Sequence, residues 1–207
     1  MSVEVWTEKY RPDRLDEVVN HEQIISRLKA FVEDENIPHL LFSGPAGTGK
    51  TASSLAIAHE LFGDSWKDNV LELNASDTRG IDTIRNQVKD FARSRSIGDV
   101  PFKMIILDEA DALTPEAQQA LRRTMENYTE TCRFCLICNY SSKIIDPIRS
   151  RCSIFRFPRL DRDDALELME RICDEEDVDY TEKGLDAVIS VSQGDLRKAI
   201  NLLQSVA

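Results

Sequence analysis

A glycine-rich octapeptide limits what this chain can fold into more than any other feature. The segment Gly44-Pro-Ala-Gly-Thr-Gly49-Lys50-Thr51 matches the pattern G-x-x-x-x-G-K-T. It follows an apolar run, His39–Ser43, and precedes a segment with helical spacing, which is the context that the pattern requires. The glycines let backbone N–H groups turn toward phosphate oxygens, and Lys50 adds a full positive charge. A chance glycine turn is the alternative, but the flanking strand and helix favour a phosphate-binding loop (P-loop).

The chain up to Pro158 alternates apolar runs with helical spacing. The runs expected to form strands are His39–Ser43, Val70–Asn74, Lys103–Leu107, Phe134–Cys138 and Ile154–Phe157. The helices expected between them are Thr51–Phe62, Ile81–Phe91 and Pro115–Tyr128. Regular alternation of strand and helix predicts an α/β fold with a parallel, doubly wound sheet.

Only helical patterns follow Pro158. The expected helices are Asp161–Glu175, Thr181–Val191 and Asp195–Val206. We therefore expect a P-loop nucleotide-binding domain over residues 1–159 and a small helical domain over residues 160–207. The last helical pattern continues to Ala207, so we expect the natural protein to extend further.

Charge and hydropathy limit the classes of function. The net charge of −11 excludes a protein covered with cations for nucleic-acid binding, so any DNA-binding surface is expected to be a local patch. No apolar run is long enough to span a bilayer and no signal segment follows Met1. These observations predict a soluble, cytoplasmic protein with no membrane partner.

Three of the five cysteines lie in one apolar segment, Cys132-Arg-Phe-Cys-Leu-Ile-Cys138. The spacing could suggest zinc or an iron–sulfur cluster, but the segment also has the pattern of a buried strand. Cys132 and Cys135 would then point to opposite faces of the sheet. We therefore expect reduced core cysteines and neither a metal site nor a disulfide framework.

Two carboxylates stand where another apolar segment ends, in Ile105-Ile-Leu-Asp108-Glu109-Ala-Asp111. In a parallel sheet this strand end lies beside the P-loop. The pattern is that of a Walker B motif, in which Asp108 and the Thr51 hydroxyl would hold Mg²⁺ and Glu109 would orient the water that attacks the γ-phosphate. A solvated surface loop is the alternative for either acid, but the P-loop favours the functional interpretation.

Six further motifs indicate which family of P-loop proteins the chain resembles. They are Tyr10-Arg11-Pro12, Ser76-Asp77-Thr78-Arg79-Gly80, Leu121-Arg122-Arg123-Thr124-Met125-Glu126, Cys138-Asn139-Tyr140, Ser150-Arg151-Cys152 and Gly194-Asp195-Leu196-Arg197. Together they resemble the replication factor C small subunits, which are AAA+ clamp-loader proteins, and especially the archaeal members. The resemblance runs from about Val5 to the end of the chain. It implies an AAA+ P-loop domain and a helical lid domain that bind ATP or ADP with Mg²⁺, without the collar domain of the family, so we expect a chain truncated to the first two domains.

The motifs also indicate which residues of this chain correspond to the nucleotide-binding residues of the family. The resemblance implies contacts along the whole P-loop and in the N-terminal segment that wraps adenine. These residues are Gly44, Pro45, Ala46, Gly47, Thr48, Gly49, Lys50, Thr51, Ala52, Tyr10, Arg11, Pro12, Val18 and Val19.

Catalysis in the family depends on further polar residues, which correspond here to Lys50, Glu109, Asn139, Arg151 and Arg197. The resemblance implies that Asn139 is the sensor 1 residue, which would bind the γ-phosphate or the attacking water; an ordinary strand-end cap is the alternative. Arg197 would be the sensor 2 arginine, which couples ATP to the angle between the domains. Arg151 would be the arginine finger that faces the ATP of a neighbouring subunit, and a surface salt bridge is its alternative.

A basic stripe runs along the helix that is expected after Gly80. Arg85, Lys89 and Arg93 recur at helical spacing, offset from the apolar face, and Arg79 lies just before them. The corresponding helices in clamp loaders track the DNA backbone, so Arg79, Arg85 and Lys89 are candidate phosphate contacts. The alternative is a solvated face paired with acids of the same helix, Asp82 and Asp90.

The resemblance implies an ATP-driven switch in DNA replication. ATP binding would order a ring, expected to be a heteropentamer of a replication factor C large subunit and further small subunits, which opens a sliding clamp and accepts primer-template DNA. Hydrolysis would then release the clamp. Two alternatives stay open: a motor of the same fold such as a branch-migration helicase, and a non-catalytic scaffold that binds ATP only for structure.

Overall fold

The computed structural model describes residues 4–76 and 81–207, with the side chains of residues 81–85 outside the description. A five-stranded sheet forms the centre of the first domain, with the strand order β2-β3-β4-β1-β5 and parallel pairing throughout. The strands are β1 (His39–Ser43), β2 (Val70–Asn74), β3 (Lys103–Asp108), β4 (Cys132–Cys138) and β5 (Cys152–Arg156). The five expected strands and the parallel α/β fold are therefore confirmed, with small shifts at the strand ends.

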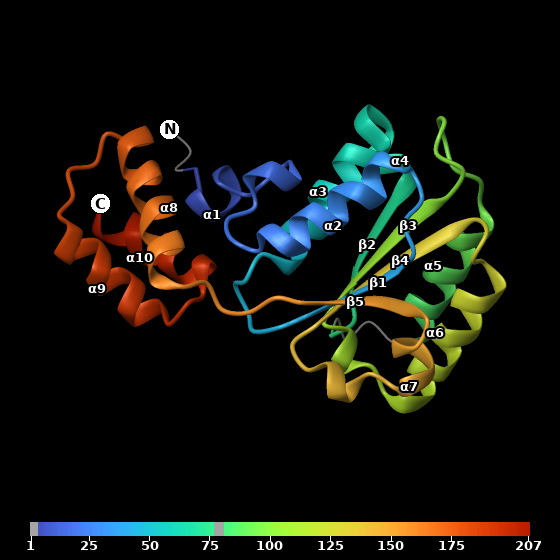
Figure 1. Cartoon of the computed structure of the whole chain (residues 1–207). Coiled ribbons are helices and arrows are strands. Elements are labelled where there is room, and N and C mark those ends of the chain that lie inside the picture. The colour runs from blue at the N-terminus through green and yellow to red at the C-terminus, as the bar shows by residue number, and fades with distance from the viewer. Residues whose placement is uncertain (1–3, 77–80) are drawn as a thin grey trace.

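Helices cover both faces of this sheet (Figure 1). One face carries α2 (Glu22–Glu33), α3 (Lys50–Phe62) and α4 (Trp66–Asn69), and the other carries α5 (Ile81–Arg93), α6 (Pro115–Asn127) and α7 (Asp146–Arg149). Successive strand residues alternate between the two cores, because side chains of a strand point to opposite faces. Leu40 and Phe42 pack in the core beneath α3, whereas Leu41 packs in the core beneath α6.

The cysteines of β4 follow the same alternation. Cys135 belongs to the core beneath α3, and Cys132 and Cys138 belong to the core beneath α6. The prediction that Cys132 and Cys135 point to opposite faces is confirmed. All three thiols are buried, and burial raises the pKa of Cys132 and of Cys138 to about 12, so both remain protonated at neutral pH.

Three helices form the small second domain: α8 (Arg162–Glu175), α9 (Glu182–Ser192) and α10 (Leu196–Val206). Each begins at a polar cap whose side chain accepts a backbone N–H of the first turn, and these caps are Asp161, Thr181 and Asp195. Such a cap contributes about 1 kcal/mol to helix stability. No helix among the described residues combines the length and the apolar character needed to cross a membrane.

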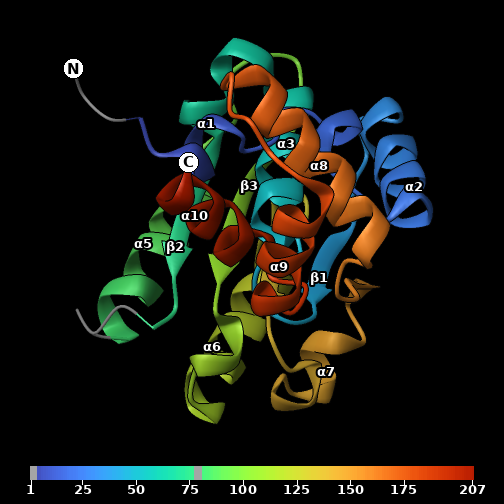
Figure 2. The ribbon, with the colours of Figure 1, turned by 90° about the vertical axis from the view of Figure 1, so that its left-hand side faces the viewer.

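The start of the chain joins the two domains. Trp6 of α1 (Trp6–Lys9) is buried in the same core as Leu168 and Leu203 of the helical domain, and its backbone N–H donates to Gln204 Oε1 at 3.1 Å. Figure 2 shows α1 beside α10. The chain then returns to the first domain through the 3-10 helix η1 (Leu15–Glu17), where the Leu15 N–H donates to the Glu60 carboxylate of α3 at 2.8 Å.

Short 3-10 helices complete the described part of the chain. They are η2 (Gly63–Ser65), η3 (Ala110–Ala112) and η4 (Ser141–Lys143). Two of them, η3 and η4, closely follow the ends of β3 and β4, so the chain turns sharply at the carboxyl edge of the sheet. That edge is where ligands bind in open parallel sheets.

Candidate nucleotide-binding site

The predicted P-loop lies at the carboxyl edge of the sheet, between β1 and α3. Its first residue is fixed to the neighbouring strand, because the Gly44 N–H donates to the Cys138 carbonyl at 3.2 Å. Its last glycine, Gly49, has a φ of 88° and forms the N-cap of α3. The first backbone N–H groups of α3 are therefore aimed at the loop, where the helix dipole favours an anion.

Lys50 is folded over this loop. Only 7% of its surface is exposed, and its Nζ donates to the carbonyl oxygens of Gly44 at 2.8 Å and Pro45 at 2.5 Å. Burial lowers the pKa of Lys50, and the negative charges of Asp108 and Asp111 oppose that effect. The ammonium group thus lies between the P-loop and the acidic end of β3, as a phosphate-binding lysine requires.

The two residues predicted to hold Mg²⁺ touch each other. Thr51 Oγ1 donates to Asp108 Oδ2 at 2.8 Å, and Asp108 Oδ1 accepts the Glu109 N–H at 2.7 Å. A hydroxyl and a carboxylate side by side are the oxygen ligands that Mg²⁺ takes from proteins, with water and phosphate completing its coordination. The donor set therefore fits the predicted metal, which when bound would neutralise phosphate charge.

Glu109 and Asn139 lie at the same edge of the sheet. Glu109 follows β3 with a left-handed backbone, at a φ of 52°, and its side chain is exposed. Asn139 follows Cys138, which is the register partner of Ser43, the residue before the P-loop. The Tyr140 N–H donates to Asp111 Oδ2 at 3.2 Å and so joins the loops after β3 and β4. Both candidates thus lie at the edge of the sheet that carries the P-loop, and neither lines the pocket described next.

A pocket opens between the P-loop, the N-terminal segment and the helical domain. Its lining includes most residues predicted to contact nucleotide: Tyr10, Arg11, Pro12, Val18, Val19, Gly47, Thr48, Gly49, Lys50, Thr51, Ala52 and Arg197. The predicted contacts Gly44, Pro45 and Ala46 belong to the other half of the loop and lie outside that lining. Sequence reasoning missed four further lining residues from α8 and α10, which are Leu168, Arg171, Leu196 and Ile200.

Tyr10 connects this pocket to the end of α8. Its hydroxyl donates to Glu176 Oε1 at 2.8 Å, and Lys9 Nζ donates to the same oxygen at 2.8 Å. Burial and this hydrogen bond raise the pKa of Tyr10 to about 12. The phenol therefore stays protonated and can keep its bond to the helical domain across the physiological pH range.

A backbone contact brings Arg197 to the P-loop. The N–H of Leu196, the first residue of α10, donates to the Gly47 carbonyl at 3.0 Å. Gly47 has a φ of 69°, and a Cβ added there would stand 1.9 Å from Asp195 Oδ1. Only glycine therefore lets the loop approach the helical domain this closely.

Replacement of Gly47 by alanine is expected to separate the P-loop from α10. The methyl group would displace Asp195, which also caps α10, and the positive φ adds strain. We expect the free energy of unfolding to fall by about 2 kcal/mol and ATP affinity to fall with it. Thermal unfolding and calorimetric titration measure the two effects. Gly63→Ala is the control, since Gly63 has a positive φ but no atom of the described residues lies within 4 Å of its added Cβ. Equal losses in both variants would show that backbone strain alone is responsible.

His21 is a further residue that sequence reasoning missed. It is buried, its Nε2 lies 3.1 Å from the Thr48 carbonyl of the P-loop, and its ring packs edge-on against Phe157 at 5.0 Å between ring centroids. Burial lowers the pKa of His21, so the neutral imidazole is favoured. The Thr48 contact then requires the proton on Nε2. A single histidine after an asparagine carries no periodic signal, so only the folded structure reveals this support of the loop.

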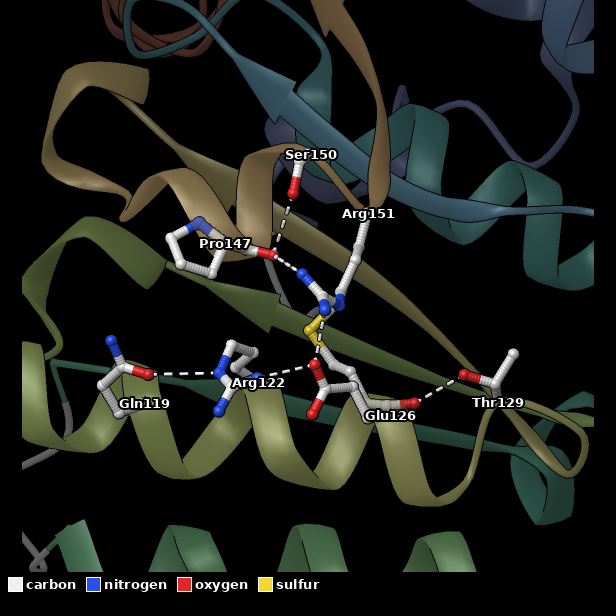
Figure 3. A network of polar contacts seen from close by, with 8 residues as sticks. Gln119, Arg122, Glu126, Thr129, Pro147, Ser150 and Arg151 are labelled. Atoms are coloured by element: carbon white, nitrogen blue, oxygen red, sulfur yellow. Dashed lines mark hydrogen bonds and ion pairs between the residues drawn. The ribbon is translucent and has the colours of Figure 1, made fainter.

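Arg151 lies far from its own P-loop. It directly precedes Cys152, which pairs with His39 at the amino end of β1, whereas the P-loop follows Ser43 at the carboxyl end. Strand rise is about 3.3 Å per residue, so these ends are separated by about 13 Å before the loop begins. Arg151 Nη2 instead contacts Glu126 Oε1 of α6 at 2.6 Å (Figure 3). Arg151 thus forms a surface salt bridge, which was the predicted alternative to the finger role.

The predicted DNA contacts are only partly within the described residues. Arg79 and the side chain of Arg85 lie outside them. Lys89 is exposed on α5, whereas Arg93 Nε donates to the Tyr128 hydroxyl at 2.8 Å. Lys89 is therefore accessible to solvent, and its contact with DNA stays a prediction, whereas Arg93 binds the C-cap residue of α6.

Similarity to known proteins agrees with this geometry. Residues 40–160 match the model of the ATPase family associated with various cellular activities (AAA), and residues 167–207 match the RCF1/5-like AAA+ ATPase lid domain. The chain resembles solved structures of point variants of Thermotoga maritima RuvB, one at a TM-score of 0.77 and 21% identity and another at 0.78 and 22%. It is covered to 95% and 96% in these comparisons, and each RuvB chain to 65%, so they show the shared fold.

Curated relatives are much closer in sequence. The replication factor C small subunits of Thermofilum pendens and Archaeoglobus fulgidus are each 58% identical to the chain, over 100% and 99% of its length, and that of Methanococcus vannielii is 59% identical over 98%. The chain spans 64% of the length of each of these relatives. The chain therefore belongs to the AAA family of ATPases, and the resemblance to replication factor C small subunits that its motifs indicated is confirmed by these relatives.

Proposed function

We propose that this protein is an ATP-dependent clamp-loader subunit that helps to open a sliding clamp and to load it onto primer-template DNA during replication. One observation carries the proposal: the P-loop binds the helical domain through Gly47 and Leu196, while Arg151 lies at the opposite end of the sheet. A nucleotide in this pocket would contact both domains of its own subunit. Arg151, the proposed arginine finger, would contact the nucleotide of a neighbouring subunit instead. ATP occupancy can therefore set both the domain angle and the assembly of a ring.

The roles within the site follow from position and charge. Lys50 and the backbone of the P-loop would bind phosphates, and Thr51 with Asp108 would hold Mg²⁺. Glu109 would act as the base that orients water, with Asn139 beside it as sensor 1. Arg197, exposed on the first turn of α10 and on the pocket wall, would report the γ-phosphate to the helical domain.

The partners follow from the family. Replication factor C small subunits are the named relatives, so we infer a ring with a large subunit and further small subunits, a sliding clamp and primer-template DNA, in an intracellular setting. A branch-migration helicase would hydrolyse ATP without regard to a clamp. A non-catalytic scaffold would bind ATP without turnover.

ATP turnover by the assembled complex distinguishes these possibilities. The measurement compares the complex alone, with primed DNA, with clamp, and with both. We expect the largest rate with both, because clamp and DNA stabilise the ring geometry that brings each finger to a neighbouring site. A rate that is indifferent to the clamp contradicts the clamp-loader proposal, and the absence of single-turnover hydrolysis in the ring would favour the scaffold.

Lys89→Ala is expected to weaken binding of the complex to primed DNA without sequence preference. One phosphate contact contributes about 0.9 to the slope of log K against log salt, so that slope should become shallower by about one. Fluorescence anisotropy across a salt series measures it. Lys67→Ala is the matched control, because Lys67 is also exposed but lies on α4, on the opposite face of the sheet from α5. An unchanged slope in Lys89→Ala would remove this residue from the DNA-binding surface.

A further inference from the structure

Arg151 is held in a defined position by its own subunit. Its Nη2 contacts Glu126 Oε1 at 2.6 Å, and its Nη1 donates to the Pro147 carbonyl of α7 at 2.6 Å. The two acceptors come from different elements, the end of α6 and the start of α7, and Figure 3 shows the guanidinium between them. The rotation of a long side chain is thereby restricted at both terminal nitrogens.

Glu126 is itself fixed before it meets Arg151. The Nη1 of Arg122, one helical turn earlier on α6, contacts the same Glu126 Oε1 at 2.6 Å, and Arg122 Nε donates to Gln119 Oε1 at 3.1 Å. A chain of contacts therefore runs from Gln119 through Arg122 and Glu126 to Arg151 (Figure 3). Glutamate and arginine four residues apart on a helix face are natural neighbours, so α6 sets the position of the carboxylate.

The contact leaves part of the arginine available. Two terminal N–H groups serve Glu126 and Pro147, whereas the guanidinium carries five in a rigid fork. The Arg151 side chain keeps 39% of its surface exposed, and that of Glu126 keeps 34%. A phosphate oxygen of ATP bound to a neighbouring subunit can therefore reach the remaining N–H groups of Arg151 while the Glu126 carboxylate keeps its contact with Nη2.

We propose that Glu126 is a positioning residue for hydrolysis: it holds the Arg151 finger in the orientation in which the ATP of a neighbouring subunit meets it. The inference rests on the proposed clamp-loader function. An exposed ion pair adds little to folding stability. We therefore infer that the Glu126–Arg151 pair serves to orient the guanidinium group. An arginine carries a large rotamer entropy, and a finger that is already oriented does not lose it at the moment of reaction.

Glu126→Gln tests the proposal in the assembled complex, because glutamine keeps the size and one acceptor oxygen but loses the charge. We expect kcat for ATP to fall about tenfold in Glu126→Gln and further in Glu126→Ala, since small misplacements of a catalytic group have effects of this order. The KM for ATP and the melting temperature should stay unchanged, because Glu126 touches neither the pocket nor the core. Glu130→Gln is the matched control, an exposed acid just beyond the same helix.

The same substitution in an Arg151→Ala background isolates the mechanism. If Glu126 acts through Arg151, the double variant should turn over at the rate of Arg151→Ala alone. A further tenfold loss in the double variant, or a lower melting temperature, would show a structural role and overturn the inference. So would an unchanged or a raised kcat in Glu126→Gln. If Arg151→Ala itself keeps the full rate, the trans-finger part of the proposed function fails, which is a separate result.

Discussion

Replacement of Lys50 by methionine is expected to lower the affinity for ATP about 10- to 150-fold, because a charge-assisted bond to phosphate contributes about 1.5–3 kcal/mol. The ammonium lies over the P-loop carbonyls of Gly44 and Pro45, next to Asp108. Methionine retains much of the length of the side chain but cannot donate to an anion. Isothermal titration calorimetry with ATP and Mg²⁺ measures the change.

Stability provides the control for this experiment. Burial lowers the pKa of Lys50, which means that the fold disfavours the charged amine relative to water. An apolar replacement removes that penalty, so the free energy of unfolding of Lys50→Met should not decrease. Lys183→Met, on the exposed surface of α9, should leave both ATP affinity and stability unchanged. Retained ATP affinity in Lys50→Met would contradict the assignment of the P-loop.

Apolar patterns predicted most of the fold because each longer element buries apolar side chains. The run from Leu40 to Phe42 is apolar at every position, since β1 has a core on both faces, and the helix around Leu55 has apolar residues at helical spacing. The helix α2 also has apolar residues at helical spacing, at Ile25 and Leu28, although it was not among the expected elements. The shortest α-helices, α1, α4 and α7, span four residues each, which is too few for a period to be visible.

Motif positions predicted which residues meet at the carboxyl edge of the sheet, but not the contacts that support them. Thr51 and Asp108 are far apart in sequence, and their contact follows from the strand–loop–helix context of each motif. Three other contacts join segments that no local pattern relates: Trp6 in the core of the helical domain, His21 against the P-loop, and Glu126 against Arg151. They depend on tertiary packing, so only the folded chain reveals them.

Arg151→Ala is expected to reduce ATP turnover in the assembled complex about 1,000-fold, with ATP binding retained. Arginine fingers contribute about 10³–10⁵ to the rate of related phosphoryl transfers, because the guanidinium stabilises charge on the transferring phosphoryl group. Arg151 is separated from its own P-loop by the length of β5, so the loss should not extend to the affinity of its own subunit for ATP. Arg151→Lys should restore little, since lysine lacks the planar fork. Steady-state turnover and nucleotide titration measure the two quantities.

Mixing two defective subunits decides whether the finger acts across an interface. A Lys50→Met subunit has lost its nucleotide site but keeps its finger, and an Arg151→Ala subunit has the opposite defect. If Arg151 serves a neighbour, rings that contain both should regain turnover wherever an intact finger faces an intact P-loop. If Arg151 served its own subunit, no mixture could recover, because every subunit would lack one half of its site. Recovery in the mixture, with none in either parent ring, is the result that the strand register predicts.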